Sequence, residues 1–196
     1  MRLWLVRHGE TALTAERRYC GHADPPLSER GREQARALAS LLPRGIPVWS
    51  SDLLRARETA ELACAASPRV SPAFRELDFG RFDGLSASEC EALDRQAFTA
   101  FVERPAEAAA PGGERLADLA RRVRAGLATL RAQTEGEVAA LVAHGGPIRL
   151  LLLDVLGMPL ADLHKLGVDP GSASLVEWWG GGATLRLLNL VPERPS

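Results

Sequence analysis

The sequence has little of what marks a secreted, zinc-binding or membrane-spanning protein. Its three cysteines, Cys20, Cys64 and Cys90, are odd in number and far apart, which indicates neither a disulfide framework nor a zinc site. No apolar run approaches the roughly 20 residues of a membrane-spanning helix. The apolar run at the N-terminus is also too short for a signal peptide. We therefore expect a soluble, cytoplasmic protein without a membrane partner.

An excess of either charge is missing as well. The chain has 24 basic and 25 acidic residues and a net charge of -1, which gives no general attraction to nucleic acid or to an anionic membrane. Lysine is nearly absent, because Lys165 is the only lysine and every other basic residue is an arginine. We expect no nucleic acid partner, and any affinity for phosphate must come from basic groups gathered at one place.

The 196 residues have the length of one domain that buries its own hydrophobic core. Short apolar runs, typical of buried strands, alternate with apolar residues at the three- and four-residue spacing of amphipathic helices. This alternation predicts an α/β fold, a three-layer sandwich in which helices flank a mainly parallel sheet. The expected strands are 3–6, 46–49, 138–143, 175–179 and 185–190, the last two as a hairpin, and the expected helices are 28–42, 53–66, 86–102, 116–133 and 148–156.

Two local features refine this reading of a single domain, residues 1–196. The segment of about 76–113 has weaker periodicity and ends in a stretch rich in proline, alanine and glycine. We expect it to be a helical and loop insertion over the sheet. Ser51 and Asp52 stand just before the helix at 53–66, where a side chain that caps the helix N-terminus belongs.

Two histidines follow predicted strands. His8 comes after 3–6 and His144 after 138–143, and each precedes a glycine, which lets backbone amides approach a bound anion. Either histidine alone would more often be structural. Arg7, beside His8, and Arg55, just beyond strand 46–49, add guanidinium groups that match phosphate oxygens. Because ligands of an open α/β sheet collect at the carboxyl ends of its strands, these four residues predict a phosphate pocket.

Five short motifs are spread over nearly the whole chain. In order they are LVRHGET at 5–11, PLSERG at 26–31, SDLLRA at 51–56, ELDFG at 76–80 and VAHGG at 142–146. In this combination and order they resemble the histidine phosphatase superfamily, in the branch that includes phosphoglycerate mutases, fructose-2,6-bisphosphatase and α-ribazole phosphatase. The resemblance implies a phosphoglycerate mutase-like fold and a phosphatase activity.

The resemblance also implies a role for each matched residue. His8 would be the nucleophile that accepts the phosphoryl group as phosphohistidine, while His144, Arg7 and Arg55 would hold the phosphoryl oxygens. Glu76 would protonate the leaving oxygen and then activate the water that hydrolyses the phosphoenzyme. Catalysis of this phosphoryl transfer depends mainly on the positioning of the reactants and on charge near the phosphoryl oxygens, so we expect neither a metal nor a cofactor.

Several assignments near these motifs are less direct. Thr14 stands where many relatives have an asparagine that binds phosphate, so its contact is expected to be shorter or missing. We keep Thr14 among the phosphate-binding residues, together with Gly145. Glu10 and Asp78 are carboxylates in similar segments, and either could replace Glu76, although Glu10 is the better candidate for a structural role.

Other polar residues are expected away from the chemistry. His22 and His164 are expected at the surface or in loops, and the group Arg121-Arg122-Arg124 on a solvated face, with Arg17 or Arg18 able to reach the mouth of the site.

The predicted substrate rests on one further sequence segment, residues 17–27. RRYCGHADPPL at 17–27 most resembles α-ribazole phosphatase, which acts on α-ribazole 5'-phosphate in cobalamin synthesis, and a broad-specificity or sugar-phosphate phosphatase is the alternative. A phosphoglycerate mutase is disfavoured because mutases typically read glutamate-arginine-histidine-tyrosine-glycine at 76–80. A non-enzymatic sensor is disfavoured because His8, His144 and Arg55 are all present. We expect a small phosphorylated metabolite as partner, and a homodimer is compatible with the sequence.

Overall fold

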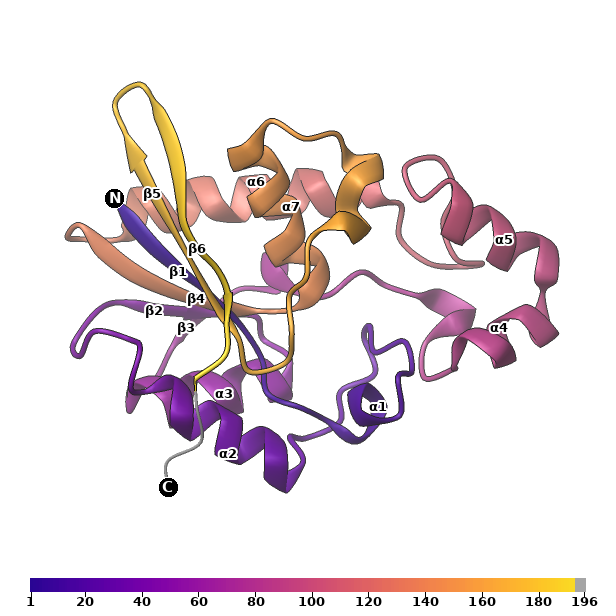
Figure 1. Ribbon diagram of the computed structural model, residues 1–196, viewed down its shortest axis with the longest axis horizontal. Coiled ribbons are helices and arrows are strands. Elements are labelled where there is room, and N and C mark those ends of the chain that lie inside the picture. The colour runs from indigo at the N-terminus through magenta and orange to yellow at the C-terminus, as the bar shows by residue number, and fades with distance from the viewer. Residues whose placement is uncertain (193–196) are drawn as a thin grey trace.

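A six-stranded sheet with helices on both faces forms the centre of the computed structural model, which describes residues 1–192 (Figure 1). The strand order is β3-β2-β4-β1-β5-β6, with the first four strands parallel and the last two antiparallel to their neighbours. The predicted α/β sandwich with a mainly parallel sheet is therefore confirmed. The strands are β1 (Arg2–Arg7), β2 (Val48–Ser50), β3 (Arg69–Val70), β4 (Val138–Ala143), β5 (Ala173–Trp179) and β6 (Gly182–Leu190).

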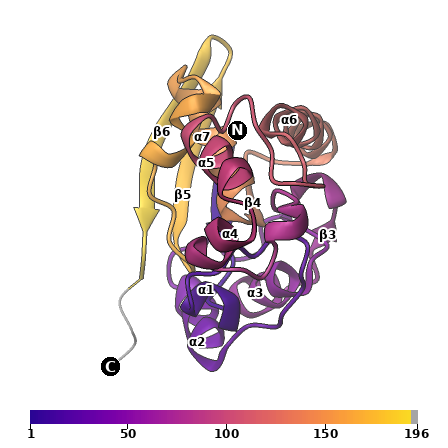
Figure 2. The same ribbon diagram turned by 90° about the vertical axis from the view of Figure 1, so that its right-hand side faces the viewer.

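Two pairs of helices make the outer layers of the sandwich. α2 (Glu29–Leu38) and α3 (Leu54–Cys64) cover one face of the sheet, and α6 (Leu116–Gln133) and α7 (Gly145–Leu156) cover the other (Figures 1 and 2). Because successive residues of a strand point to opposite faces, each buried strand contributes to two cores. The leucines Leu3 and Leu5 of β1 pack in the core under α6 and α7, whereas Val6 packs with α2 and α3.

The shorter elements lie mainly beyond the carboxyl ends of the parallel strands. Figure 2 shows α4 and α5 in front of the sheet when the molecule is viewed from that end. That the segment 76–113 is an insertion stays a prediction. These elements are α1 (Ala12–Ala15), α4 (Ala87–Leu93) and α5 (Arg95–Glu103), with 3-10 turns η1 (Pro72–Phe74), η2 (Gly80–Phe82) and η3 (Leu160–Lys165).

The predicted single helix at 86–102 is wrong, because the chain breaks at Asp94. The backbone of Asp94 is extended (φ -158°, ψ 87°), and its carboxylate accepts a hydrogen bond from the Ala97 N–H at 3.0 Å. A short acidic side chain competes in this way for backbone donors, so it ends one helix and caps the next.

The cap of α3 also differs from the expectation. The N-cap is Leu53, and the Leu54 N–H donates to both carboxylate oxygens of Asp24, at 2.8 and 3.0 Å. Asp52 instead forms a two-pronged ion pair with Arg75. The helix is therefore capped by a loop thirty residues away in sequence. Among the helices that the structure describes, none is long and apolar enough to cross a membrane.

Candidate active site

The register of the sheet brings the two histidines together. β1 and β4 pair in parallel with Arg7 opposite Ala143, so His8 and His144 leave the sheet side by side at its carboxyl edge. Their ring centroids are 5.0 Å apart. β2 lies on the other side of β4, with Ser50 opposite Val142, and the chain after it enters α3, which carries Arg55. Three strand ends thus meet at one place, as the sequence predicts.

His8 is held in the form that a nucleophile needs. It is 2% exposed, and its Nδ1 lies 2.7 Å from the carbonyl oxygen of Gly9. A carbonyl can only accept, so Nδ1 carries the proton and Nε2 keeps its lone pair. Burial, followed by the charges of Arg55 and Arg7, lowers the pKa of His8 well below its ordinary value of 6.5. The imidazole is therefore neutral at neutral pH.

Several buried polar groups next to His8 are left without a partner. His144 is completely buried, and within residues 1–192 neither of its ring nitrogens has a hydrogen-bond partner. The same holds for Nε of Arg7, whose NH1 donates to the Val168 carbonyl at 2.6 Å. Burial, followed by Arg55, also lowers the pKa of His144 well below 6.5. Buried polar groups are nearly always hydrogen-bonded, so these unpaired nitrogens are free to contact an anion, as the predicted phosphate pocket requires.

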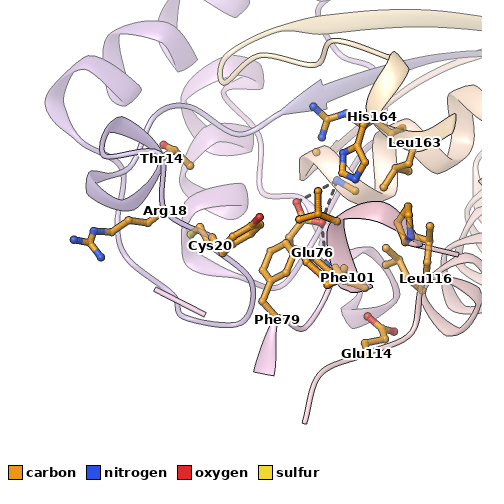
Figure 3. Close-up of a pocket in the computed structure, with 18 of the residues that line it drawn as sticks. Thr14, Arg18, Cys20, Glu76, Phe79, Phe101, Glu114, Leu116, Leu163 and His164 are labelled. Atoms are coloured by element: carbon orange, nitrogen blue, oxygen red, sulfur yellow. Dashed lines mark hydrogen bonds between the residues drawn. The ribbon is translucent and has the colours of Figure 1, made fainter. Parts of the chain in front are cut away.

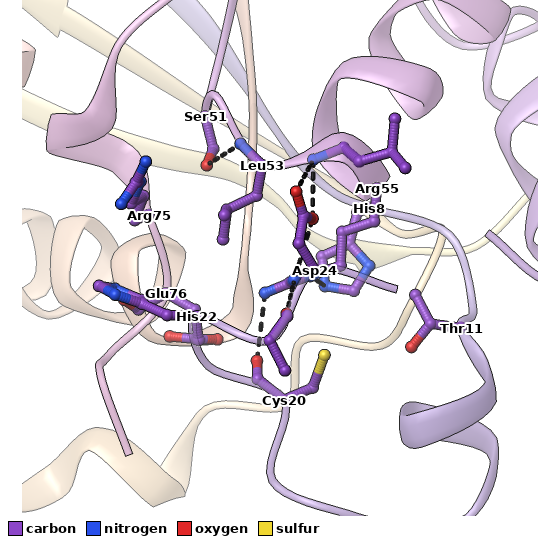
Figure 4. Close-up of polar contacts among 12 residues, drawn as sticks. His8, Thr11, Cys20, His22, Asp24, Ser51, Leu53, Arg55, Arg75 and Glu76 are labelled. Atoms are coloured by element: carbon purple, nitrogen blue, oxygen red, sulfur yellow. Dashed lines mark hydrogen bonds and ion pairs between the residues drawn. The ribbon is translucent and has the colours of Figure 1, made fainter. Parts of the chain in front are cut away.

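Arg55 joins His8 to the loop at 20–24. It is fully buried, its Nε donates to His8 Nε2 at 3.3 Å, and its terminal nitrogens donate to the carbonyls of Cys20, Gly21 and Ala23 (Figure 4). Most of its donors are thus already used by the protein. The predicted phosphate contact of Arg55 stays a prediction, but its contact with His8 is direct.

Glu76 lies at the N-terminus of α7, beside the histidine that precedes this helix. It is 8% exposed, and its carboxylate oxygens accept the Gly146 N–H at 3.0 and 3.1 Å. A side chain at Gly146 would collide with the same carboxylate, which explains why glycine occupies this position. The predicted proton donor is therefore held by a backbone amide in the first turn of α7, the helix that His144 precedes.

A cavity of about 420 Å³ is lined by Glu76 and by residues from several elements around it (Figure 3). We call the lining residues Arg7, His8, Glu76 and Gly145 the charged floor, after the guanidinium of Arg7 and the carboxyl of Glu76, and the remaining lining residues the wall. The wall contains both apolar and charged side chains, the charged ones being Arg18, Glu114 and Arg149. Its apolar and aromatic residues include Tyr19, Phe79, Phe101, Leu116, Leu119 and Leu163.

Comparison with known proteins identifies the family. Residues 3–191 match the model of the histidine phosphatase superfamily (branch 1). The chain belongs to this superfamily. It is 35% identical to the adenosylcobalamin/α-ribazole phosphatase of Salmonella typhimurium over 96% of both chains. It is also 34% identical to phosphoserine phosphatase 1 of Hydrogenobacter thermophilus, over 90% of this chain and 86% of that one.

Solved structures agree with the sequence relatives. The α-ribazole phosphatase of Shigella flexneri superposes with a TM-score of 0.88 and 32% identity, covering 98% of each chain. The predicted phosphoglycerate mutase-like fold and the predicted phosphatase class of this histidine phosphatase are thus confirmed. In the described part of the chain, no three His, Cys, Asp or Glu side chains gather as a metal site would require.

Two predicted phosphate ligands of this histidine phosphatase occupy different positions. Gly145 is buried, and a Cβ there would come within 3.6 Å of both Arg7 and Glu76, so it lies at the centre of the charged floor. Thr14 lines the cavity, but its hydroxyl caps α1 by bonding to Thr11. Phosphate contact by either residue stays a prediction.

Sequence reasoning missed some residues of the cavity. His164, expected at the surface or in a loop, lines it, and so does Arg149, whose Nε donates to the Leu166 carbonyl at 2.7 Å. Burial and then the charge of Arg149 lower the pKa of His164. A helical spacing signal was available for Arg149, which lies one turn after Gly145, but η3 with His164 carries no motif.

Glu10 binds the Ser28 hydroxyl at 2.9 Å, consistent with the structural role expected of it.

Proposed function

We propose that this histidine phosphatase hydrolyses phosphomonoesters through a phosphohistidine formed at Nε2 of His8. The observation that carries the proposal is the 2.7 Å contact of His8 Nδ1 with the Gly9 carbonyl, which assigns the proton to Nδ1 and leaves the lone pair of Nε2 for attack. Within residues 1–192, the only hydrogen bond to that lone pair is a long one from Arg55, at 3.3 Å. A bound phosphoryl group would take its place.

The surrounding residues account for the remaining steps. Nε2 attacks phosphorus while the bond to the leaving oxygen breaks, and Glu76 supplies the proton to that oxygen. The resulting carboxylate then takes a proton from water, which attacks the phosphohistidine and releases inorganic phosphate together with free His8. The unpaired nitrogens of His144 and Arg7 meet the negative charge of the transferring group.

We propose that the substrate has a 5'-phosphate at one end and an apolar aromatic group at the other, as α-ribazole 5'-phosphate has. A volume of about 420 Å³ lies within the roughly 300–1,000 Å³ of small-molecule sites and suits a nucleoside-sized ligand. The charged floor fits the phosphate, and the aromatic residues Phe79 and Phe101 on the wall fit a flat apolar base. The names of the similar proteins from Salmonella and Shigella support the same substrate. Three unpaired cysteines are compatible with the reducing cytoplasm that we expect for this reaction.

Trapping tests the covalent step. During turnover, a quench that avoids acid should leave phosphate on His8, and His8→Gln should abolish both the trapped phosphate and turnover while the protein stays folded. Wild-type turnover by His8→Gln would end the proposal.

A substrate panel tests the specificity. We expect kcat/KM for α-ribazole 5'-phosphate to exceed that for fructose bisphosphate and for phosphoglycerates by at least tenfold. Similar values across the panel would instead establish a phosphatase of broad specificity.

A further inference from the structure

The segment that carries Glu76 has no regular secondary structure of its own. Residues 75–79 lie between the short turns η1 and η2, outside every strand and helix. A carboxyl that gives and takes a proton must nevertheless stay within hydrogen-bond reach of the leaving oxygen. Something other than secondary structure must therefore fix the backbone at Glu76.

Arg122 of α6 supplies that support. Its guanidinium donates to three carbonyls in and just before the segment, those of Ala73 at 3.0 Å, Arg75 at 2.8 Å and Glu76 at 2.8 Å. On its other side it binds both oxygens of Glu114, at 2.7 and 2.8 Å. These five hydrogen bonds use all five N–H groups that a guanidinium has. The group is thus completely committed to this one arrangement.

Burial distinguishes this pair from an ordinary surface ion pair. The side chains of Arg122 and Glu114 are 24% and 17% exposed, and the Glu114 N–H also donates to the Asp78 carbonyl at 2.9 Å. His22 contacts the carbonyl of Glu76 from another loop, at 3.1 Å. Arg122, expected on a solvated face, and His22, expected at the surface or in a loop, therefore contact the same carbonyl group.

We propose that Arg122, fixed by Glu114, is a positioning residue that aligns Glu76 for proton transfer. The proposal rests on the acid and base role proposed above for Glu76. Arg122 touches the backbone of the segment, and its effect on catalysis passes through the carboxylate at the N-terminus of α7. Lysine has only three N–H donors and no planar fork, so it cannot reproduce the arrangement.

The same helix offers a matched control. Arg124 also forms a two-pronged ion pair, with Asp154, but its side chain is 53% exposed, and its side-chain hydrogen bonds within residues 1–192 go to Asp154. Arg124→Gln therefore removes the same charge from α6 without disturbing the Glu76 segment.

The experiment compares leaving groups in pre-steady-state bursts of phosphoenzyme formation. An alkoxide from ribose 5-phosphate needs protonation, whereas p-nitrophenolate leaves readily as an anion. We expect Arg122→Gln, like Glu76→Gln, to lower the burst rate with ribose 5-phosphate at least tenfold more than that with p-nitrophenyl phosphate. Arg122→Lys should not restore the lost rate, and Arg124→Gln should change either rate less than twofold.

Non-additivity provides the second readout. If Arg122 acts through Glu76, the double variant Glu76→Gln/Arg122→Gln should be no slower with ribose 5-phosphate than Glu76→Gln alone. The positioning role would be overturned if Arg122→Gln lowered the burst rate equally for both leaving groups, or if the losses in burst rate were additive in the double variant. Either result would leave the proposed role of Glu76 intact. Equal losses in Glu76→Gln itself would remove the proposed role of Glu76 and this inference with it. Should Arg122→Gln fail to fold, the same comparisons with Glu114→Gln decide the matter.

Discussion

Acidification should destabilise this phosphatase through His8 and His144. Burial, followed by the charge of Arg55, lowers the pKa of both imidazoles well below 6.5. In the unfolded chain both histidines take up a proton near pH 6.5, whereas in the folded protein both stay neutral until the pH is lower. Between these values the unfolded state binds more protons, so the free energy of unfolding decreases as the pH falls below 6.5 and is insensitive to these groups above it.

The size of this effect follows from the number of protons. Each histidine changes the free energy of unfolding by about 1.4 kcal/mol per pH unit, and two change it by about 2.7 kcal/mol per pH unit. Between pH 6.5 and 5 the loss is at most about 4 kcal/mol, which is a large share of the roughly 5–15 kcal/mol by which domains are stable.

Urea unfolding between pH 5 and 8 measures this loss. Phosphate must be left out of the buffers, because an anion bound in the pocket would stabilise the folded state. The free energy of unfolding of the wild type should fall below pH 6.5, and that of the variant His8→Gln/His144→Gln should fall far less. The loss in each single variant should lie about halfway between these two losses. The reasoning is refuted if the wild type and the double variant show the same pH dependence in this range.

Two further predictions concern metal and the cap of α3. Turnover should persist in excess chelator, because guanidinium and imidazole groups face the phosphate site, and a loss that a divalent ion restores would contradict this. Asp24→Ala should lower the free energy of unfolding by about 0.5–2 kcal/mol, as expected for loss of a helix cap. Asp24→Asn, which keeps an oxygen acceptor for the Leu54 N–H, should lose less, and equal losses in thermal or urea unfolding would show that the cap is not the cause.

The local pattern of the sequence was enough to predict much of the fold. α6 and β4 have the predicted bounds, because long amphipathic and continuous apolar segments encode their structure locally. The meeting of His8 and His144 could also be predicted, since parallel strands end at a common edge. The helical pattern of the sequence continues across Asp94, so it does not predict the break there. The non-helical backbone of Asp94, whose side chain caps α5 by accepting the Ala97 N–H, separates α4 from α5.

The tertiary structure decided how the site is supported. The sequence by itself was enough to predict which residues carry the chemistry, because His8, His144 and Glu76 stand in contiguous motifs with their own local signals. Asp24 caps a helix thirty residues away, and Arg122 binds carbonyls up to 49 residues away. Such contacts leave no periodicity in the sequence, because a backbone carbonyl presents the same acceptor whatever residue carries it. Which carbonyl an arginine reaches is therefore decided only by the packing of the complete fold.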